Sequence, residues 1–302
     1  MRFSVRAPAS SANLGPGFDA IGLALDLWNE VVVDTDGEPG SVVNEGPEAA
    51  LLAGRENLTL RAMRTLASDH GRDLPPFALT ARTHIPVARG LGSSAAALVA
   101  GLIAANHLLG LELGDDDLYA VAWRIEGHGD NVGAALYGGT VLAVPQVRGT
   151  VRLWGSDGEV IGLTAIAFIP EATGATWAAR AALPSHIPHA DATFNVATAC
   201  GLALGWRLRD HHLIAAGMHD RLHEPYRARL FPHLEAMQAA ARDAGAVGAC
   251  LSGAGPTVLA LVAPAHKDAV GAALEATAAR LGTFGYVREL TPTPCGARIQ
   301  EC

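Results

Sequence analysis

The stretch ARGLGSSAAALVAG, residues 88–101, places two glycines and two serines directly before a run of helix-forming residues. Glycines allow a backbone to approach a ligand closely, and the first N–H groups of a helix attract anions. The stretch therefore predicts a phosphate-binding loop at a helix N-terminus. It lacks the Gly-Lys-Ser/Thr ending of a P-loop, so the positive charge has to come from a source other than lysine.

Two other interpretations of this stretch stay open. A plain tight turn, with one of the two serines capping the helix, needs no ligand. Gly90, Gly92 and Ala95 also fit the G-x-G-x-x-A dinucleotide fingerprint, and Glu112 follows Gly92 by 20 residues. That fingerprint requires a strand after the helix, whereas residues 115–129 predict a second helix, so a dinucleotide site is disfavoured.

The chain has 302 residues, half of them hydrophobic, and a formal net charge of −8. This length favours two domains or one large one, with ample material for a buried core. The acidic balance disfavours a nucleic-acid partner, because binding to phosphate backbones needs a basic face.

The apolar stretch Ala95–Leu111 is too short for a typical membrane span and contains Asn106 and His107, so we expect a buried core helix and no membrane partner. The four cysteines show no metal-ligand spacing, and the first residues contain no apolar signal segment. We therefore expect a soluble, cytoplasmic protein.

Hydrophobic periodicity predicts strands alternating with helices in both halves, which indicates the α/β or the α+β class. A polar, glycine-rich segment at 10–20 separates the first two strands, and turn residues place a domain boundary near residue 155. The expected strands are 2–8, 21–35, 76–85, 138–146, 150–154, 161–170, two within 247–262, and 285–290. The expected helices are 60–68, 95–111, 115–129, 177–183, 191–207, 213–223, 233–244 and 268–281.

Three segments in register along the chain resemble the motifs of one family. Pro86–Ala97 resembles the second motif of the GHMP kinases, named for galactokinase, homoserine kinase, mevalonate kinase and phosphomevalonate kinase. Ala7–Asp19 resembles the first motif and Gly248–Thr257 the third. Further segments, EGHGDNV at 126–132 and EPYR at 224–227, resemble the homoserine kinase branch, although Gly129 stands where many relatives carry proline.

This resemblance implies transfer of a phosphoryl group from ATP to the hydroxyl of L-homoserine, on the way to threonine. It also implies an α+β fold of two domains, here 1–155 and 156–302. The N-terminal domain would contain an unusual left-handed β-α-β unit, and the C-terminal domain would be ferredoxin-like. Such kinases use Mg²⁺ and are often homodimers.

The resemblance also assigns residues to ATP and to the metal ion. Ser94 and Glu126 are the implied Mg²⁺ ligands, and both offer the oxygen atoms that this ion prefers. Asn57 would lie near the adenine, although a helix N-cap is an equal alternative, and Arg89 is expected to face solvent. The implied ATP-binding residues are Asn57, Pro86, Val87, Ala88, Arg89, Gly90, Leu91, Gly92, Ser93, Ser94, Ala95, Ala96, Ser252 and Gly253.

Homoserine is a zwitterion, so its site needs a cationic partner for the carboxylate and an anionic partner for the ammonium. The resemblance points to Arg180 and Arg227 for the first and to Asp19, helped by Asp130, for the second. The alternative is that both arginines only form salt bridges on the protein surface and bind no ligand. The remaining implied substrate contacts are Asn13, His128, Asn131 and Thr176.

The implied catalytic residues are Asp130, Asn131 and Arg180. Asp130 is the carboxylate we would test as a base, and the alternative is that the substrate hydroxyl passes its proton to the phosphate itself.

Two other functions stay open beside transfer of a phosphoryl group to homoserine. His219 and His223 imitate the H-E-x-x-H helix of zinc proteases, with aspartate in place of glutamate and a proline directly after the segment. A sister kinase acting on mevalonate, a sugar or a diphosphocytidyl alcohol is the closer rival. Asp19 and Asp130 beside two arginines suit an amino acid better than mevalonate, which has no ammonium group.

Overall fold

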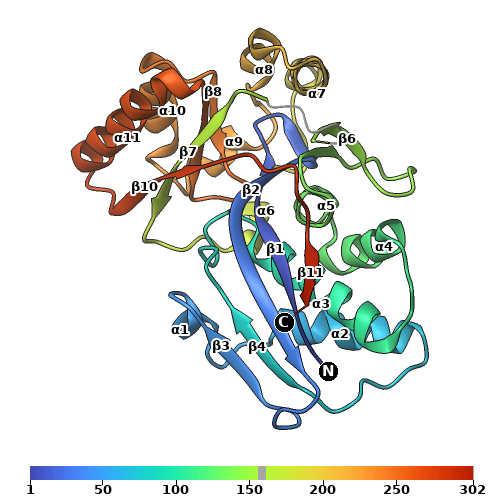
Figure 1. Ribbon diagram of the computed structural model, residues 1–302. Helices are drawn as coiled ribbons and strands as arrows, with labels where there is room; N and C mark the ends of the chain where they lie inside the picture. The colour runs from blue at the N-terminus through green and yellow to red at the C-terminus, as the bar shows by residue number, and fades with distance from the viewer. Residues whose placement is uncertain (156–160, 302) are drawn as a thin grey trace.

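The computed structural model describes residues 1–155 and 161–301 and contains two sheets with helices packed on each (Figure 1). The predicted boundary between domains 1–155 and 156–302 falls on residues 156–160, outside the described residues, and stays a prediction. The expected α+β class is confirmed by the mixture of antiparallel and parallel pairing with helices.

The first sheet is built on a long antiparallel pair, β1 and β2, and has the order β11-β1-β2-β4-β3, with β5 on β2 and β6 on β5. Only β3 and β4 are parallel in the described part of this sheet, and α1 and α2 lie between them in the chain, which makes a β-α-β unit. The elements are β1 (Arg2–Asn13), β2 (Gly17–Asp34), β3 (Val42–Glu45), α1 (Ala49–Leu52), α2 (Leu58–Asp69), β4 (Ala78–Arg82), β5 (Thr140–Leu142), β6 (Val151–Trp154) and β11 (Arg298–Glu301).

Helix α3 (Ser93–Leu109) is the centre of the first core, which explains its apolar composition. It packs against β1, β2 and α2, and its residues from Ala95 to Ala105 are almost all buried. Helices α4 (Asp115–Glu126) and α5 (Asp130–Tyr137) complete this layer. The expectation of a buried core helix at 95–111 is confirmed, and no helix among the described residues has the length and hydrophobicity to span a bilayer.

The second sheet has the strand order β10-β7-β9-β8, and α10 and α11 pack against it. Numbered as four strands along the chain, this order is 4-1-3-2 in a β-α-β-β-α-β sequence, the ferredoxin-like arrangement that the motifs implied. The elements are β7 (Thr164–Pro170), α6 (Thr176–Ala181), α7 (His189–Leu208), α8 (His211–Gly217), α9 (Glu224–Arg227), α10 (Leu234–Asp243), β8 (Gly248–Leu251), β9 (Val258–Val262), the 3₁₀ turn η1 (Pro264–His266), α11 (Lys267–Leu281) and β10 (Gly285–Leu290).

Several elements differ from the sequence prediction. Strand β1 continues through the polar residues 10–13, because Ser10 and Ser11 hydrogen-bond to Asn131 of α5 and to Ser252 instead of to solvent. The helix predicted at 213–223 is wrong beyond Gly217. There the side chain of Asp220 accepts the N–H groups of the next turns and starts α9. Helices α1, α5 and α9, the 3₁₀ turn η1 and strands β3 and β11 were not predicted.

The close packing of α2 on α3 yields the first prediction. A Cβ at Gly101 would lie 2.4 Å from the Thr59 carbonyl oxygen, whereas a Cβ at Gly201 in α7 would meet nothing within 4 Å. Gly101→Ala should lower the free energy of unfolding by about 1–3 kcal/mol through overpacking. Gly201→Ala should raise it by about 0.5–1 kcal/mol, because alanine favours the helix. Urea unfolding of both variants tests this, and the same sign for both would contradict the packing.

Candidate active site

Loops from both sheets meet at a cavity of about 100 Å³ at the N-terminus of α3. A larger hollow of about 580 Å³ lies between α2 and residues 71–77, but none of the predicted site residues lines it. Asn57, Val87, Ala96 and Ser252 do not line the smaller cavity. The predicted residues that do are Asn13, Asp19, Pro86, Ala88, Arg89, Gly90, Leu91, Gly92, Ser93, Ser94, Ala95, Glu126, His128, Asp130, Asn131, Thr176, Arg180, Arg227 and Gly253.

The start of α3 is free to meet an anion. Gly92 precedes the helix with φ of 71°, and no side chain of the described residues caps it. The expectation that Ser93 or Ser94 caps the helix is wrong, because both already lie inside its first turn. Uncapped N–H groups and the helix dipole therefore face a cavity. This supports an anion site better than the plain capped turn does.

Two close contacts hold the loop against its neighbours. A Cβ at Gly90 would lie 2.2 Å from the Ser252 carbonyl oxygen, and one at Gly92 would lie 2.0 Å from Ser10 Oγ. The Ser252 hydroxyl donates to the Gly90 carbonyl at 2.6 Å, and the Gly253 N–H donates to the carbonyl of Ala12 at 3.1 Å. The three motifs that lie far apart in sequence thus meet at one point.

Arg89 does not face solvent, and that expectation is wrong. Its side chain is 12% exposed and donates to the carbonyls of Pro170 and Glu171 and to the carboxylate of Glu48, all within 3.0 Å. The guanidinium points inward because the carbonyl groups at the end of β7 lie within hydrogen-bonding distance. Arg89 therefore ties the phosphate loop to the second sheet.

The hydroxyl of Ser94 and the carboxylate of Glu126 lie next to each other at the edge of the cavity. Ser94 Oγ lies 3.4 Å from Glu126 Oε2, and Nε2 of His128 lies 3.9 Å from the other oxygen of Glu126. Burial raises the pKa of Glu126 above its ordinary value. An oxygen pair of this kind, beside an uncapped helix start, is chemically suited to a hard divalent cation.

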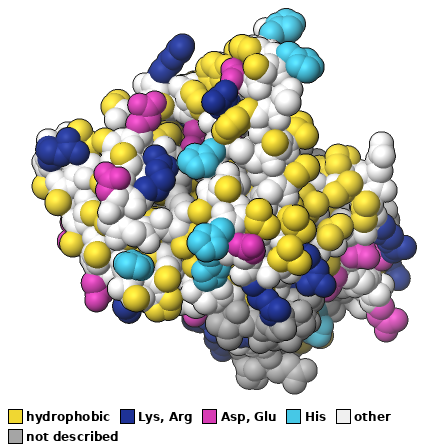
Figure 2. Space-filling model, turned by 90° about the horizontal axis from the view of Figure 1, so that it is seen from above, with side chains coloured by type: hydrophobic (Ala, Val, Ile, Leu, Met, Phe, Trp, Pro, Cys, Tyr) yellow, Lys and Arg dark blue, Asp and Glu magenta, His cyan; other side chains and the backbone are white. Residues whose placement is uncertain are grey.

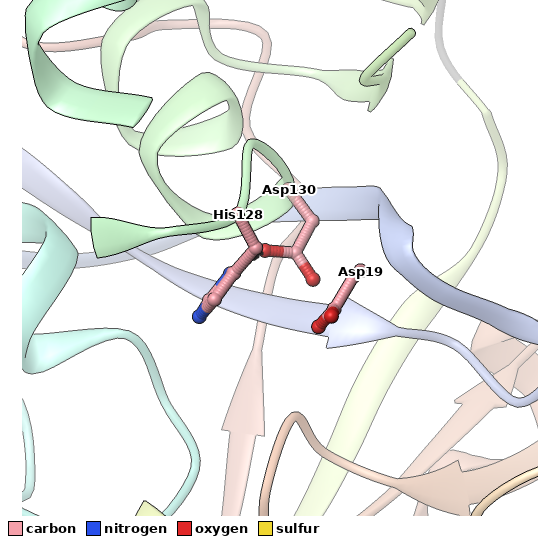
Figure 3. A group of neighbouring side chains, drawn as sticks. All are labelled: Asp19, His128 and Asp130. Atoms are coloured by element: carbon pink, nitrogen blue, oxygen red, sulfur yellow. Dashed lines mark hydrogen bonds and ion pairs between the residues drawn. The ribbon is translucent and has the colours of Figure 1, made fainter. Parts of the chain in front are cut away.

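His128, Asp130 and Asp19 form a second polar group, drawn in Figure 3. His128 Nδ1 donates to Asp130 Oδ1 at 2.5 Å, and the Asn131 N–H donates to the same oxygen at 2.7 Å. Burial is the largest influence and lowers the pKa of His128, but the hydrogen bond to Asp130 and the negative charges of Asp130, Glu126 and Asp19 together outweigh it, so the net shift is upward. Asn131 in turn accepts a hydrogen bond from Ser10 at 2.8 Å.

The two predicted arginines occupy different environments. Arg180 is 40% exposed and donates to both carboxylate oxygens of Asp19, at 3.0 and 2.8 Å. Arg227 is buried, and it donates to the carbonyls of Ala179 and Gly253 and to Nδ1 of His223. Burial, followed by repulsion from Arg180, lowers the pKa of Arg227, although a guanidinium stays charged. The surface-ion-pair alternative is therefore wrong for Arg227.

Sequence reasoning missed the residues that hold these arginines. The Phe18 ring centroid lies 5.7 Å from the guanidinium carbon of Arg180 and 5.2 Å from that of Arg227. His223 Nε2 donates to the Gly15 carbonyl at 2.8 Å, which leaves Nδ1 as an acceptor for Arg227. Burial lowers the pKa of His223 to about 4, so it stays neutral. A phenylalanine directly before the acid of the first motif was the available signal.

Two earlier alternatives are settled by these positions. His219 and His223 do not share a helix, because α8 ends at Gly217, and the His223 ring is committed to Gly15 and Arg227. The zinc-protease interpretation is therefore wrong. Asn57 caps α2 by accepting from the Leu60 N–H at 3.0 Å, so its capping role is confirmed, while a role toward adenine stays a prediction.

Comparison with known proteins places this geometry in context. Residues 57–139 match the model of the GHMP kinases N terminal domain, and residues 202–280 match that of the GHMP kinases C terminal. A homoserine kinase of Moorella thermoacetica is 39% identical over 98% of this chain and 99% of its own length. One from a Synechococcus species is 44% identical over 90% of this chain and 88% of its own.

A solved structure shares the whole fold. The crystal structure of homoserine kinase from Cytophaga hutchinsonii superimposes with a TM-score of 0.87, at 29% identity, over 99% of this chain and 97% of that one. The two-domain architecture implied by the motifs is confirmed by this match and by the two family models.

The buried acid behind Arg227 yields a prediction about pH. Glu224 accepts from the Leu251 N–H at 2.6 Å and from Gln238 at 2.7 Å, and burial raises its pKa to about 7 from an ordinary 4.5. The folded state therefore binds the proton more tightly, and wild-type stability falls as pH rises from 4.5 to 7. Relative to wild type, Glu224→Gln should gain up to about 3 kcal/mol across that window.

Urea unfolding at pH 4.5 to 7.5 measures this difference, and Glu235→Gln on the exposed face of α10 provides the reference. A difference between wild type and Glu224→Gln that stays constant with pH contradicts the assignment.

Proposed function

The chain belongs to the GHMP kinase family, and from this premise we propose that it is a homoserine kinase. It is an ATP-dependent kinase that transfers the γ-phosphate to the side-chain hydroxyl of L-homoserine and gives O-phospho-L-homoserine, in threonine biosynthesis. One observation carries the substrate choice: homoserine kinases are 39–44% identical to this chain over most of its length. The cavity supports it, since it presents both a carboxylate and guanidinium groups to a small zwitterion.

The residues around the start of α3 are proposed to bind the ATP phosphates. Residues 86–92 lead into the uncapped N-terminus of α3, and residues 93–96 form its first turn. The turn at Ser252 and Gly253 lies beside them, and backbone N–H groups at this helix start are suited to phosphate oxygens. Asn57 lies at the N-terminus of α2 and is proposed to lie toward the adenine. Arg89 contributes by fixing the loop to β7, since its donors are already engaged by protein acceptors.

Ser94 and Glu126 are proposed to hold Mg²⁺. Their adjacent hydroxyl and carboxylate oxygens are the donors this ion takes, and a carboxylate whose pKa burial raises is stabilised by a nearby cation. A bound Mg²⁺ supplies positive charge that neutralises the transferring phosphoryl group. Together with the helix dipole, it would replace the lysine that the loop lacks.

The substrate is proposed to lie between the two arginines and Asp19. Arg227 is anchored by three protein acceptors, which leaves the Nη2 donors for a carboxylate. Arg180 is the second carboxylate partner, and Asp19 binds the ammonium with help from Asp130. Asn13, His128, Asn131 and Thr176 line the same cavity and are proposed to complete the contacts.

Phosphoryl transfer proceeds through a loose transition state, so positioning and charge neutralisation supply most of the rate. Arg180 and Asn131 are proposed to orient the reacting groups. Asp130 is the proposed base, although its Oδ1 already accepts hydrogen bonds from His128 and Asn131, so only Oδ2 remains to take the hydroxyl proton. If Asp130 only binds substrate, the hydroxyl proton passes to the phosphate itself.

A homodimer is also proposed for this chain. Three apolar side chains on α7, Val196, Leu204 and Leu208, are 66%, 50% and 59% exposed. Figure 2 looks onto the side of the molecule that α7 and α8 form, and hydrophobic side chains gather there. Exposed apolar surface of this kind is typical of protein contacts. We further propose that the enzyme works in the cytoplasm.

The function is tested by ADP release from ATP across homoserine, mevalonate, galactose and threonine. Homoserine should be the preferred acceptor. Preference for mevalonate would favour the sister-kinase alternative, and no ADP release with any acceptor would contradict the proposal.

Arg227→Leu should raise the KM for homoserine by at least about tenfold, since losing a buried charged hydrogen bond costs more than about 1.4 kcal/mol. The KM for ATP should stay nearly unchanged, because the proposed ATP contacts are backbone N–H groups, whereas Arg227 reaches that side of the cavity only through the carbonyl of Gly253. Arg221→Leu is the control, since that exposed arginine pairs with Asp191 outside the cavity. An equal rise in both KM values for Arg227→Leu counts against the carboxylate role.

Glu126→Gln should lower kcat and raise the Mg²⁺ concentration needed for half-maximal activity, because an amide oxygen binds the ion more weakly than a carboxylate. Glu112→Gln, at an exposed position outside the cavity, is the control. Unchanged activity and Mg²⁺ dependence in Glu126→Gln would show that the metal assignment is wrong.

A further inference from the structure

The cavity already contains an internal copy of the charge pair that a zwitterion would bring. Arg180 and Asp19 are proposed above to bind the substrate carboxylate and ammonium, yet they bind each other through two hydrogen bonds of 2.8 and 3.0 Å. We propose that this ion pair selects substrates carrying both charges, because only a zwitterion gives each partner a replacement. The inference rests on the proposed homoserine kinase function.

Arg180 is the residue of the ion pair that can leave its partner and bind a ligand carboxylate instead. Its side chain is 40% exposed and that of Asp19 is 34% exposed, so water can solvate both groups while the pair opens. Arg227 cannot take its place opposite Asp19, because it is buried and held by the carbonyls of Ala179 and Gly253 and by His223. A ligand carboxylate that uses both arginines therefore has to draw Arg180 away from Asp19.

Phe18 gives both guanidinium groups a shared support. Its ring lies within 5.7 Å of Arg180 and within 5.2 Å of Arg227, and cations are attracted to an aromatic face. Arg180 can therefore turn from Asp19 toward a ligand carboxylate while it stays against the same ring. The ring thus holds two like charges close to one anion site.

Asp19 lies beside a second carboxylate, so losing its cationic partner is unfavourable even where water reaches it. Candidate ligand atoms of Asp19, His128 and Asp130 lie within 4.8 Å of one another, so a second carboxylate is near. His128 is engaged by Asp130 at 2.5 Å. Among the described contacts, Arg180 is the cation that hydrogen-bonds to Asp19. A hydroxy acid without an ammonium group would take Arg180 and leave this carboxylate unpaired.

The exchange therefore differs between the two kinds of ligand. A zwitterion breaks one ion pair and forms two, so binding is favoured. A ligand with only a carboxylate breaks one ion pair and forms one. Its binding free energy is therefore less favourable than its contacts with Arg180 and Arg227 alone would give. The internal pair thus acts against singly charged acids, in addition to the direct attraction between Asp19 and an ammonium group.

Calorimetric Kd values for L-homoserine and for 4-hydroxybutyrate, which lacks the ammonium group, test this selection. Asp19→Asn should weaken homoserine binding and tighten 4-hydroxybutyrate binding by about two- to fivefold, the range that a partly exposed ion pair supports. Asparagine suits this position because Asp19 has φ of 57°, which asparagine tolerates. In an Arg180→Met background, Asp19→Asn should give no gain for 4-hydroxybutyrate.

Asp191→Asn is the matched control. Its ion pair with Arg221, at 3.3 Å and with 52% and 28% exposed side chains, lies outside the cavity. Neither ligand should change its affinity in this variant, and far-ultraviolet circular dichroism checks that every variant is folded.

The possible results distinguish selection by the Arg180–Asp19 ion pair from the proposed binding of homoserine itself. If Asp19→Asn weakens homoserine but leaves 4-hydroxybutyrate unchanged or weaker, the ammonium contact stands and the selection by the internal pair is overturned. If the gain persists in the Arg180→Met background, it reflects general electrostatics and the inference is again overturned. If homoserine binding is unaffected by Asp19→Asn, the proposed ammonium contact itself is wrong.

Discussion

The approach of the loop at 88–92 to two other backbone segments is the constraint on which the site depends. A side chain at Gly90 would collide with the Ser252 carbonyl, and one at Gly92 would collide with Ser10. Because both positions are glycine with positive φ, three distant segments converge and α3 starts uncapped at the cavity. A longer residue at either position would separate the helix dipole from the residues that face it.

Charge balance inside the cavity follows from that convergence. The arginines come from α6 and α9 and the carboxylates from the first sheet and from α4 and α5, so opposite charges meet only because the two halves pack together. The buried charged groups have hydrogen-bond partners inside the protein. His223 accepts from Arg227, and His128 donates to Asp130. Apart from Arg180, which the proposed exchange moves, such a site is organised before any ligand arrives, and this lowers the cost of ordering it during catalysis.

Local pattern predicted the helices and strands whose periodicity is strong, including α3, α7 and the strands of the second sheet, and the three motifs predicted most of the cavity lining. Long-range partners decided what local pattern missed. Ser10 and Ser11 look like loop residues but extend a strand, because their hydroxyls bond to distant groups. Arg89 turns inward because β7 ends beside it, and α8 stops early because Asp220 offers its carboxylate to the following N–H groups. The groups that hydrogen-bond to Ser10, Ser11 and Arg89 are distant in sequence. Only Asp220 is close to the helix end that it affects.

The pairing of β1 with β11 has a consequence for how the chain is made. Phe3 pairs with Glu301 and Arg6 with Arg298, so β1 finds its outer neighbour only when residues 298–301 have left the ribosome (Figure 1). Until then, one edge of β1 has open N–H and C=O groups, the kind of edge on which other nascent chains can pair. Contacts of such large sequence separation also slow folding. Completion of the first sheet therefore waits for residues 298–301, and a chaperone that shields this edge until then would aid the yield of folded enzyme.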